Sequence, residues 1–160
     1  MAIEQRKPMS PSPLIISQTL HRQIESEGEA GYPNEICGMI FGRDVAGGVQ
    51  QRRLTVKLVP GKNVSEADEQ YHRFSIDPLQ QLKAERAAEK EGLILLGYYH
   101  SHPDAPARPS QYDLDHAWEV YSYVIVSIAK GKAVDMTSWV LSAIGEARTF
   151  AQQVIQQTET

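Results

Sequence analysis

The sequence predicts an α/β domain in which a mixed β-sheet is flanked by helices, and three observations lead to that prediction. The chain has 160 residues, of which 41% are hydrophobic, so it can bury a single core. Amphipathic segments with helical spacing alternate with short apolar runs. The run at 93–99 is almost continuously apolar, as expected of a central strand covered on both faces. This alternation is typical of an α/β sandwich.

Charge and composition argue against several kinds of partner. Sixteen lysines and arginines against twenty aspartates and glutamates give a net charge of −4 without a basic stripe, so we expect no nucleic-acid partner. No uncharged apolar stretch approaches the ~20 residues that a membrane helix needs, so we expect no membrane partner. A single cysteine cannot form an internal disulfide, which suits a reducing compartment and predicts a cytoplasmic location.

The N-terminal part of the chain divides into a lead and a helix. Residues 1–13 are polar and proline-rich, so we expect a disordered lead, followed by one domain over 14–157. Within that domain, Leu20 and Ile24 lie four residues apart among polar side chains. This spacing predicts a short amphipathic helix over 17–30.

A β-hairpin is predicted next. The compact apolar run at 36–42 is followed by two glycines at 47–48, and residues 49–59 then alternate between apolar and polar side chains. Residues 64–72 are charged and are expected to form a loop. A brief extended piece is expected at 74–76.

The second half of the chain again alternates between helices and strands. Asp77 is a good N-cap and stands directly before Pro78, so a helix should extend from there to about Glu91. The apolar central strand at 93–99 follows. The remaining predicted elements are a short helix at 110–118, strands at 120–129 and 136–144, and a tail at 148–156 whose pattern fits strand and helix equally.

Two histidines separated by one residue follow the predicted central strand. Side chains two apart on a strand point to the same side, with Cα atoms ~6.5–7 Å apart, so His100 and His102 can bind one metal ion. Ten residues with three prolines then lead to Asp113, which can supply a third ligand. Two histidines and one carboxylate leave a position open for water, which is typical of catalytic zinc.

A structural explanation competes with the metal site. A His-x-His sequence arises by chance, and Ser110 with Asp113 also fits a capping box at a helix N-terminus. The two roles are compatible, because a carboxylate in the first helical turn lies at the mouth of the helix. On their own, the two histidines are better explained as a chance occurrence. Together with the proline, the serine and the spaced aspartate, they favour the metal site.

The combined pattern resembles the motif of the JAB1/MPN/Mov34 (JAMM) metalloproteases. The motif residues are His-Ser-His-Pro at 100–103, followed by Ser110 and Asp113. The family also expects an upstream glutamate. Here Glu35 lies in Pro-Asn-Glu-Ile-Cys-Gly-Met-Ile-Phe-Gly at 33–42, which matches the Pro-x-Glu-x-Cys-Gly segment of prokaryotic members.

The likeness covers most of the chain and implies a fold. Phe-Ser-Ile-Asp-Pro at 74–78 resembles a further family segment, and the similarity extends from the first predicted helix to about Ile144. The resemblance implies an MPN domain, a sandwich related to that of cytidine deaminases. It also implies a zinc-dependent peptidase or isopeptidase.

The resemblance implies a role for each motif residue. One zinc ion per chain would be bound by His100, His102 and Asp113. Glu35 would take a proton from the attacking water and pass it to the leaving amine, as a carboxylate commonly does. Ser110 would donate a hydrogen bond to the oxyanion, which is typically worth ~10²–10³ in rate. Without the resemblance, a glutamate before a strand would more often be an exposed loop residue with no catalytic role.

Two neighbouring residues offer alternatives. Cys37 lies two residues after Glu35 and could act as a nucleophile beside a histidine. The metal site already uses both nearby histidines, so we expect Cys37 to be a small, buried packing residue. His116 lies one helical turn after Asp113; it could be a spare ligand, but a helix-surface position is expected.

The family cleaves bonds formed by the Gly-Gly tail of ubiquitin or ubiquitin-like proteins. The chain after Asp113 is too short for the insertion with which eukaryotic members grip ubiquitin, so it resembles the compact prokaryotic branch. The implied partner is a ubiquitin-like protein of the sulfur-carrier type with a Gly-Gly tail; a homodimer is left open. The rival interpretation is a non-catalytic MPN scaffold that binds such a partner, although scaffolds lose ligands that this chain keeps. A zinc deaminase is disfavoured, because its His-x-Glu and Pro-Cys-x-x-Cys sequences are absent.

Overall fold

The computed structural model describes residues 11–47, 50–63, 75–144 and 147–160. The helices of this part of the chain are α1 (Gln18–Gly31), α2 (Pro78–Lys90) and α3 (Gln111–His116). Its strands are β1 (Leu14–Ser17), β2 (Cys37–Gly47), β3 (Gln50–Gly61), β4 (Ile94–Pro103), β5 (Ser122–Ala129), β6 (Lys132–Ile144), β7 (Ala147–Gln153) and β8 (Ile155–Thr158).

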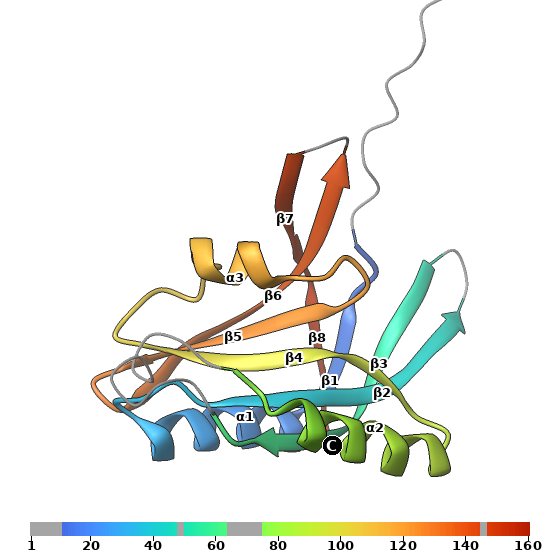
Figure 1. The fold of residues 1–160 in the computed structure, drawn as a ribbon, viewed down its shortest axis with the longest axis horizontal. Coiled ribbons are helices and arrows are strands. Elements are labelled where there is room, and N and C mark those ends of the chain that lie inside the picture. The colour runs from blue at the N-terminus through green and yellow to red at the C-terminus, as the bar shows by residue number, and fades with distance from the viewer. Residues whose placement is uncertain (1–10, 48–49, 64–74, 145–146) are drawn as a thin grey trace, which may run out of the picture.

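These strands form one mixed, curled sheet in the order β7-β6-β5-β4-β2-β3-β1-β8 (Figure 1). β4 pairs in parallel with β5, and β1 in parallel with β3 and β8. The other neighbours are antiparallel, including the predicted β2–β3 hairpin. The predicted α/β architecture is therefore confirmed.

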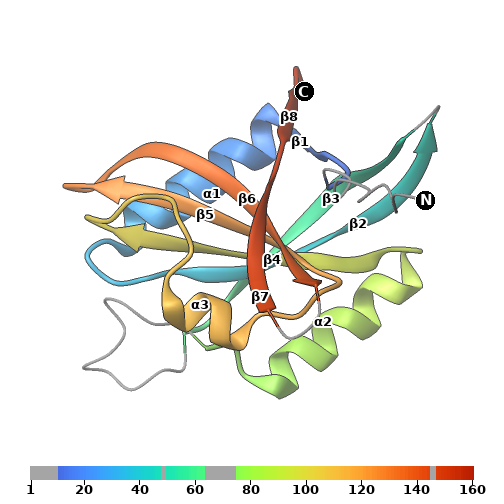
Figure 2. The ribbon, with the colours of Figure 1, turned by 90° about the horizontal axis from the view of Figure 1, so that it is seen from above.

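Helices cover both faces of the sheet, with α1 and α2 on opposite sides of the central strands (Figure 2). Ile24 of α1 packs against apolar side chains of β2, β4 and β5. On the other face, Ala88 of α2 packs against Met39 and Phe41 of β2. Residues next to α3 form a third cluster with Tyr123 and Leu141. A helix thus covers each face of the central strands, which explains why the sequence of β4 is apolar on both sides.

Capping residues begin all three described helices. The Ser17 hydroxyl accepts a hydrogen bond from the backbone of Leu20 at 3.2 Å, so α1 starts at Gln18. Asp77 caps α2, with proline in the first turn as predicted. Ser110 and Asp113 form the predicted capping box of α3. Each cap satisfies a backbone N–H that has no partner inside its helix.

Gly38 allows the central strands to pack closely. A Cβ atom at this position would lie 2.1 Å from the ring of Tyr99, which is fully buried on the α1 side. The Tyr99 hydroxyl donates a hydrogen bond to Glu27 of α1 at 2.7 Å. The glycine therefore lets a large side chain cross β2 and join β4 to α1.

The ends of the chain differ most from the predictions. β1 was not predicted, and the tail, left open between strand and helix, forms β7 and β8. The backbone N–H of Leu14 donates to the Val154 carbonyl at 2.9 Å, and the Gln153 side chain to the Ser12 carbonyl at 2.6 Å. One C-terminal segment thus pairs with β6 on one edge of the sheet and with β1 on the other.

Some predictions fall on residues that the structure does not describe. Most of the lead at 1–13 and the charged loop at 64–72 lie outside the described residues, and so does Phe74 of the extended piece. Ile76 of that piece forms a β-bridge with Asn63. No helix in the described part of the chain is both long enough and apolar enough to cross a membrane.

β4 positions the sequence motif. It was predicted to end at residue 99, but its pairing with β5 continues to Pro103, opposite Ile128. The two motif histidines therefore lie on a strand rather than in the loop after it. On its other side, β4 pairs with the start of β2, where Cys37 lies opposite His100.

Candidate metal centre

Two histidine side chains meet at the end of β4. The Nε2 atoms of His100 and His102 are 3.0 Å apart. Both residues are buried, with exposed fractions of 1% and 7%. Residues two apart on a strand share a side, so the strand itself brings the imidazoles together.

The loop after β4 sets the orientation of one imidazole. His102 Nδ1 lies 2.8 Å from the carbonyl oxygen of Pro106. A carbonyl can only accept a hydrogen bond, so Nδ1 carries the proton. In the neutral ring, Nε2 then presents its lone pair to the other motif residues, which is the tautomer that a metal ligand needs.

Asp113 approaches both histidines from the first turn of α3. Its Oδ1 lies 3.3 Å from His100 Nε2 and its Oδ2 lies 3.2 Å from His102 Nε2. The capping box holds this carboxylate, because the backbone of Ser110 donates to Oδ2 at 2.8 Å. The same aspartate therefore caps the helix and completes a three-residue cluster.

Glu35 lies beside the histidines although it comes from a distant part of the chain. It is 6% exposed, and one carboxylate oxygen lies within 4.8 Å of a ring nitrogen of both His100 and His102. Ser101 holds its segment: the Ser101 backbone donates to the Ile36 carbonyl at 3.0 Å, and its hydroxyl accepts from Ile36 N–H at 2.9 Å. This role of Ser101 was not predicted, because its partner Ile36 lies 65 residues away in the sequence.

Burial and charge shift the titration of the cluster. Burial raises the pKa of Glu35 to about 8, and the negative charge of Asp113 adds to the rise. Burial also lowers the pKa of His100, which favours the neutral ring. Although burial opposes ionisation of Asp113, the two histidines hold the pKa of this carboxyl below its usual range. A neutral imidazole and an ionised carboxylate are the forms that bind metals.

The donor set fits zinc. Two imidazole nitrogens and a carboxylate oxygen are ligands that zinc accepts, and three protein ligands are usual in catalytic sites. Glu35 Oε2 is buried and accepts no hydrogen bond from any described residue. A buried carboxylate oxygen without a donor is costly, and a nearby cation offsets that cost.

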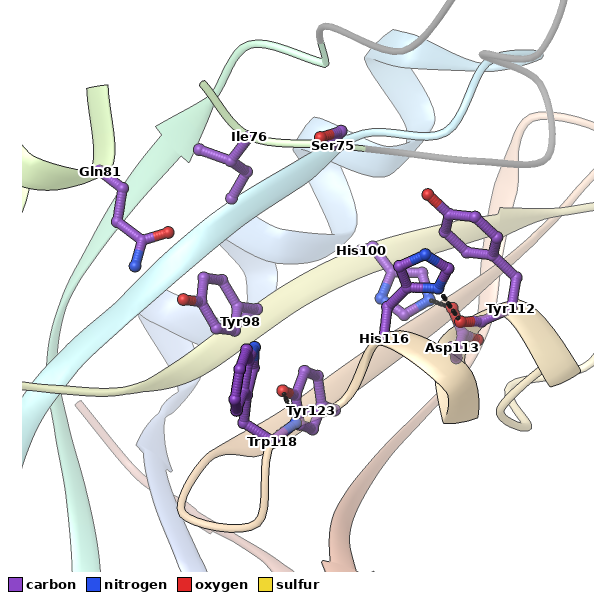
Figure 3. A pocket seen from close by; sticks show the side chains of 10 residues that line it. All are labelled: Ser75, Ile76, Gln81, Tyr98, His100, Tyr112, Asp113, His116, Trp118 and Tyr123. Carbon is purple, nitrogen blue, oxygen red and sulfur yellow. Dashed lines mark hydrogen bonds and ion pairs between the residues drawn. The ribbon is translucent and has the colours of Figure 1, made fainter. Parts of the chain in front are cut away.

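Two hollows adjoin the cluster. The first, which we call the aromatic hollow, has a volume of about 240 Å³ and is shown in Figure 3. Its lining residues are Ser75, Ile76, Gln81, Tyr98, His100, Tyr112, Asp113, His116, Trp118 and Tyr123. The second, which we call the Glu35 hollow, has a volume of about 270 Å³. Its lining residues are Glu35, His102, Pro103, Ala105, Pro106, Arg108 and Ser110.

Ser110 lines the Glu35 hollow with its hydroxyl partly engaged. The hydroxyl oxygen accepts the backbone N–H of Asp113 at 3.1 Å. Its hydrogen is still available to donate to a ligand in the hollow. The structure thus brings all five motif residues to one place, three in direct contact and two on the wall of the same hollow.

The chain matches the family described as "Prokaryotic homologs of the JAB domain" over residues 17–142. It belongs to this family. Among curated relatives, the "Probable TtuB-protein conjugate cleaving protease" of Thermus thermophilus is 45% identical over 75 residues, which are 46% of this chain and 49% of the relative. The chain thus aligns with about half the length of that protein. A "Desampylase" of Pyrococcus furiosus is 32% identical over 110 residues, covering 68% of this chain and 67% of the relative.

Solved structures support the JAB fold. A Desulfitobacterium hafniense protein superposes with a TM-score of 0.75 at 29% identity, covering 92% of this chain and 94% of that chain. A JAB1/MPN domain protein from Archaeoglobus fulgidus superposes with a TM-score of 0.53 at 15% identity, covering 94% and 100%. The latter likeness shows the fold alone.

Two further side chains of the JAB domain behave as expected of structural residues. Cys37 is buried, and burial raises the pKa of its thiol to about 12, so it stays protonated. A protonated thiol is a poor nucleophile. His116 is exposed; its Nδ1 lies 2.8 Å from the Tyr112 carbonyl and its ring stacks on the Tyr112 ring. His116 therefore belongs to the helix surface, as predicted.

Proposed function

We propose that this chain is a zinc metallopeptidase that hydrolyses a peptide or isopeptide bond after the C-terminal Gly-Gly of a ubiquitin-like protein of the sulfur-carrier type. The observation that carries the proposal is the convergence of two buried histidines and an aspartate at 3.0–3.3 Å. The relatives named as a desampylase and as a protease that cleaves TtuB-protein conjugates support this class of substrate. A cytoplasmic location stays a prediction.

His100, His102 and Asp113 would hold one zinc ion per chain. Bound there, zinc would act as a Lewis acid and would lower the pKa of a water molecule from 15.7 to about 7. The chain contributes the geometry: β4 fixes the two imidazoles, and the capping box of α3 fixes the carboxylate. Little rearrangement is then needed for binding, because all three side chains already face one another.

Glu35 would move the proton. Its carboxylate is buried beside the histidines and lines the hollow in which the reacting bond would lie. A base is most effective when its pKa is close to the working pH, and burial moves the pKa of Glu35 upwards into that region. The proton then passes to the leaving amine.

Ser110 would bind the oxyanion. The Asp113 N–H occupies one lone pair of the hydroxyl oxygen and so orients the hydroxyl. The O–H of this anchored hydroxyl group is still available as a donor at the edge of the Glu35 hollow. Such a donor, held in place before the reaction, stabilises the negative charge that develops on the glycine carbonyl oxygen.

The test uses a ubiquitin-fold carrier from the same organism, extended beyond Gly-Gly by one amino acid. Mass spectrometry should show release of the extension by the zinc-loaded enzyme. The matched control is Glu35→Gln, which should keep zinc and the fold but release nothing, because only proton transfer is lost. An intact carrier after incubation with wild-type enzyme would refute the substrate assignment. Binding of the carrier without cleavage would indicate a scaffold.

A further inference from the structure

The position of Glu35 identifies the side of the site that receives the leaving group. In the proposed reaction, Glu35 takes a proton from the attacking water and, once protonated, donates it to the departing amine, so that nitrogen must lie beside the Glu35 carboxyl group. Glu35 lines the Glu35 hollow and is absent from the lining of the aromatic hollow. The residue that follows Gly-Gly should therefore enter the Glu35 hollow.

Arg108 also lines the Glu35 hollow. Its guanidinium forms no hydrogen bond or ion pair with any residue that the structure describes. Asp135 lines a neighbouring hollow together with Arg108, but the two residues do not form an ion pair. The five N–H donors of Arg108 are thus available to a ligand, in a planar arrangement that matches a carboxylate.

The loop that carries Arg108 is anchored at several points. Its backbone N–H donates to the Pro106 carbonyl at 2.8 Å, and the preceding Ala107 is buried. Three side chains hold the carbonyl groups of the loop: Ser127 binds Ala105 at 2.6 Å, His102 binds Pro106 at 2.8 Å, and Thr137 binds Ala107 at 2.6 Å. Because the backbone of this loop is already held in place, a ligand that binds Arg108 does not have to order the loop. The conformational entropy cost of binding is therefore smaller.

We infer that Arg108 binds the α-carboxylate of the leaving amino acid, so that the enzyme selects carriers extended by one residue with a free C-terminus. The inference rests on the proposed function. In that reaction, water adds to the glycine carbonyl and the C–N bond breaks. The hydroxyl stays on the carrier as its new carboxyl group, and the proton goes to the amine of the released amino acid.

Bond connectivity supports this selection. The α-carboxylate carbon is two bonds from the scissile nitrogen, so it must lie in the same hollow as that nitrogen. The carboxylate then meets a guanidinium that no described residue neutralises. A carrier linked to a lysine side chain has no carboxylate next to the scissile nitrogen, and a longer peptide has a neutral amide there. Arg108 thus distinguishes a single-residue extension from both alternatives.

The test compares two substrates that differ only in charge: a carrier ending in Gly-Gly-Ala with a free carboxylate, and the same carrier with a C-terminal carboxamide. For wild-type enzyme, kcat/KM should be about 10- to 100-fold higher for the acid, the range expected of hydrogen bonds to a charged group. The difference should appear mainly in KM. Arg108→Ala should reduce the acid-to-amide ratio to about 1, and Arg108→Lys should keep part of it.

The matched control is Arg86→Ala, which removes an exposed arginine of α2 that lines neither hollow and should leave the ratio unchanged. Zinc content and melting temperature are measured for every variant. Equal wild-type activity on acid and amide, or a ratio that survives Arg108→Ala, overturns the role of Arg108 while cleavage itself upholds the proposed function. If wild-type enzyme cleaves neither substrate, the proposed function fails and the inference fails with it.

Discussion

Ser101→Ala should weaken both the stability and the activity of this protein and should leave its capacity to bind zinc unchanged. Ser101 lies between the two motif histidines but points to the other side of β4, where it is fully buried. Its hydroxyl accepts the backbone N–H of Ile36 at 2.9 Å, and its own N–H donates to the Ile36 carbonyl at 3.0 Å. The substitution removes the first bond and leaves the second.

The size of the stability change follows from the N–H group left without an acceptor. A buried donor that loses its partner costs about 1–3 kcal/mol, and Ile36 is half-buried, so we expect about 1–2 kcal/mol. For a chain of this size, 1 kcal/mol lowers the melting temperature by roughly 2–4 °C, so the expected decrease is about 2–8 °C. Because Ile36 adjoins Glu35, kcat should also fall. Zinc binding should persist, since no ligand is altered.

The assay combines urea unfolding, zinc content and steady-state kinetics on the extended carrier. Ser26→Ala is the control, because Ser26 lies exposed on α1, away from the metal centre. This control should change neither kcat nor zinc content. If Ser101→Ala left both the unfolding midpoint and kcat at their wild-type values, the hydrogen bond between the Ser101 hydroxyl and Ile36 would have no part in holding Glu35. A variant that lost its zinc would show instead that Ser101 supports the histidines.

Three further predictions concern the centre itself. Elemental analysis should find about one zinc per chain, and a strong chelator should remove it with loss of activity. Asp113→Ala should sharply lower zinc affinity, because it removes a charged ligand. Protein that was purified without chelator and contained no metal would contradict this prediction. Ser110→Ala should slow turnover by ~10²–10³ and cost about 1 kcal/mol of stability through the lost cap, with zinc retained; near wild-type kinetics would exclude the oxyanion role. Cys37→Ser should stay active, since burial keeps the thiol protonated; a folded, zinc-loaded but inactive variant would restore the thiol hypothesis.

Features set by a few neighbouring residues could be predicted from the sequence. The caps at Ser17, Asp77 and Ser110 each involve residues within one helical turn, and the β2–β3 hairpin depends on a short turn between two patterned runs. The shared side of the two histidines follows from strand geometry in the same way. In each case the interaction that decides the structure spans only a few residues.

Features set by distant pairing could not be predicted. β1 has only four residues, and its pairing partners lie in distant parts of the sequence; Ile15, for example, pairs with Leu54 of β3 and Gln156 of β8. The tail forms strands because β7 can pair with the edge of β6 and β8 with the edge of β1. The sequence of the tail itself carries no information about these edges. β4 likewise extends to Pro103 because β5 continues to pair with it. The same holds for Arg108, whose neighbours in the Glu35 hollow come from two separate segments.

The position of Glu35 depends on the register between two strands, and this makes the register part of the site. Cys37 lies opposite His100, and the bond from Ser101 to Ile36 continues the antiparallel pairing by one residue. Glu35 is therefore level with His102 and on the same side. A shift of one residue would turn Glu35 to the α1 side, away from both histidines. The apolar side chains of β2 that pack on both faces of the sheet hold this register, so the core of the domain determines where the proposed base lies.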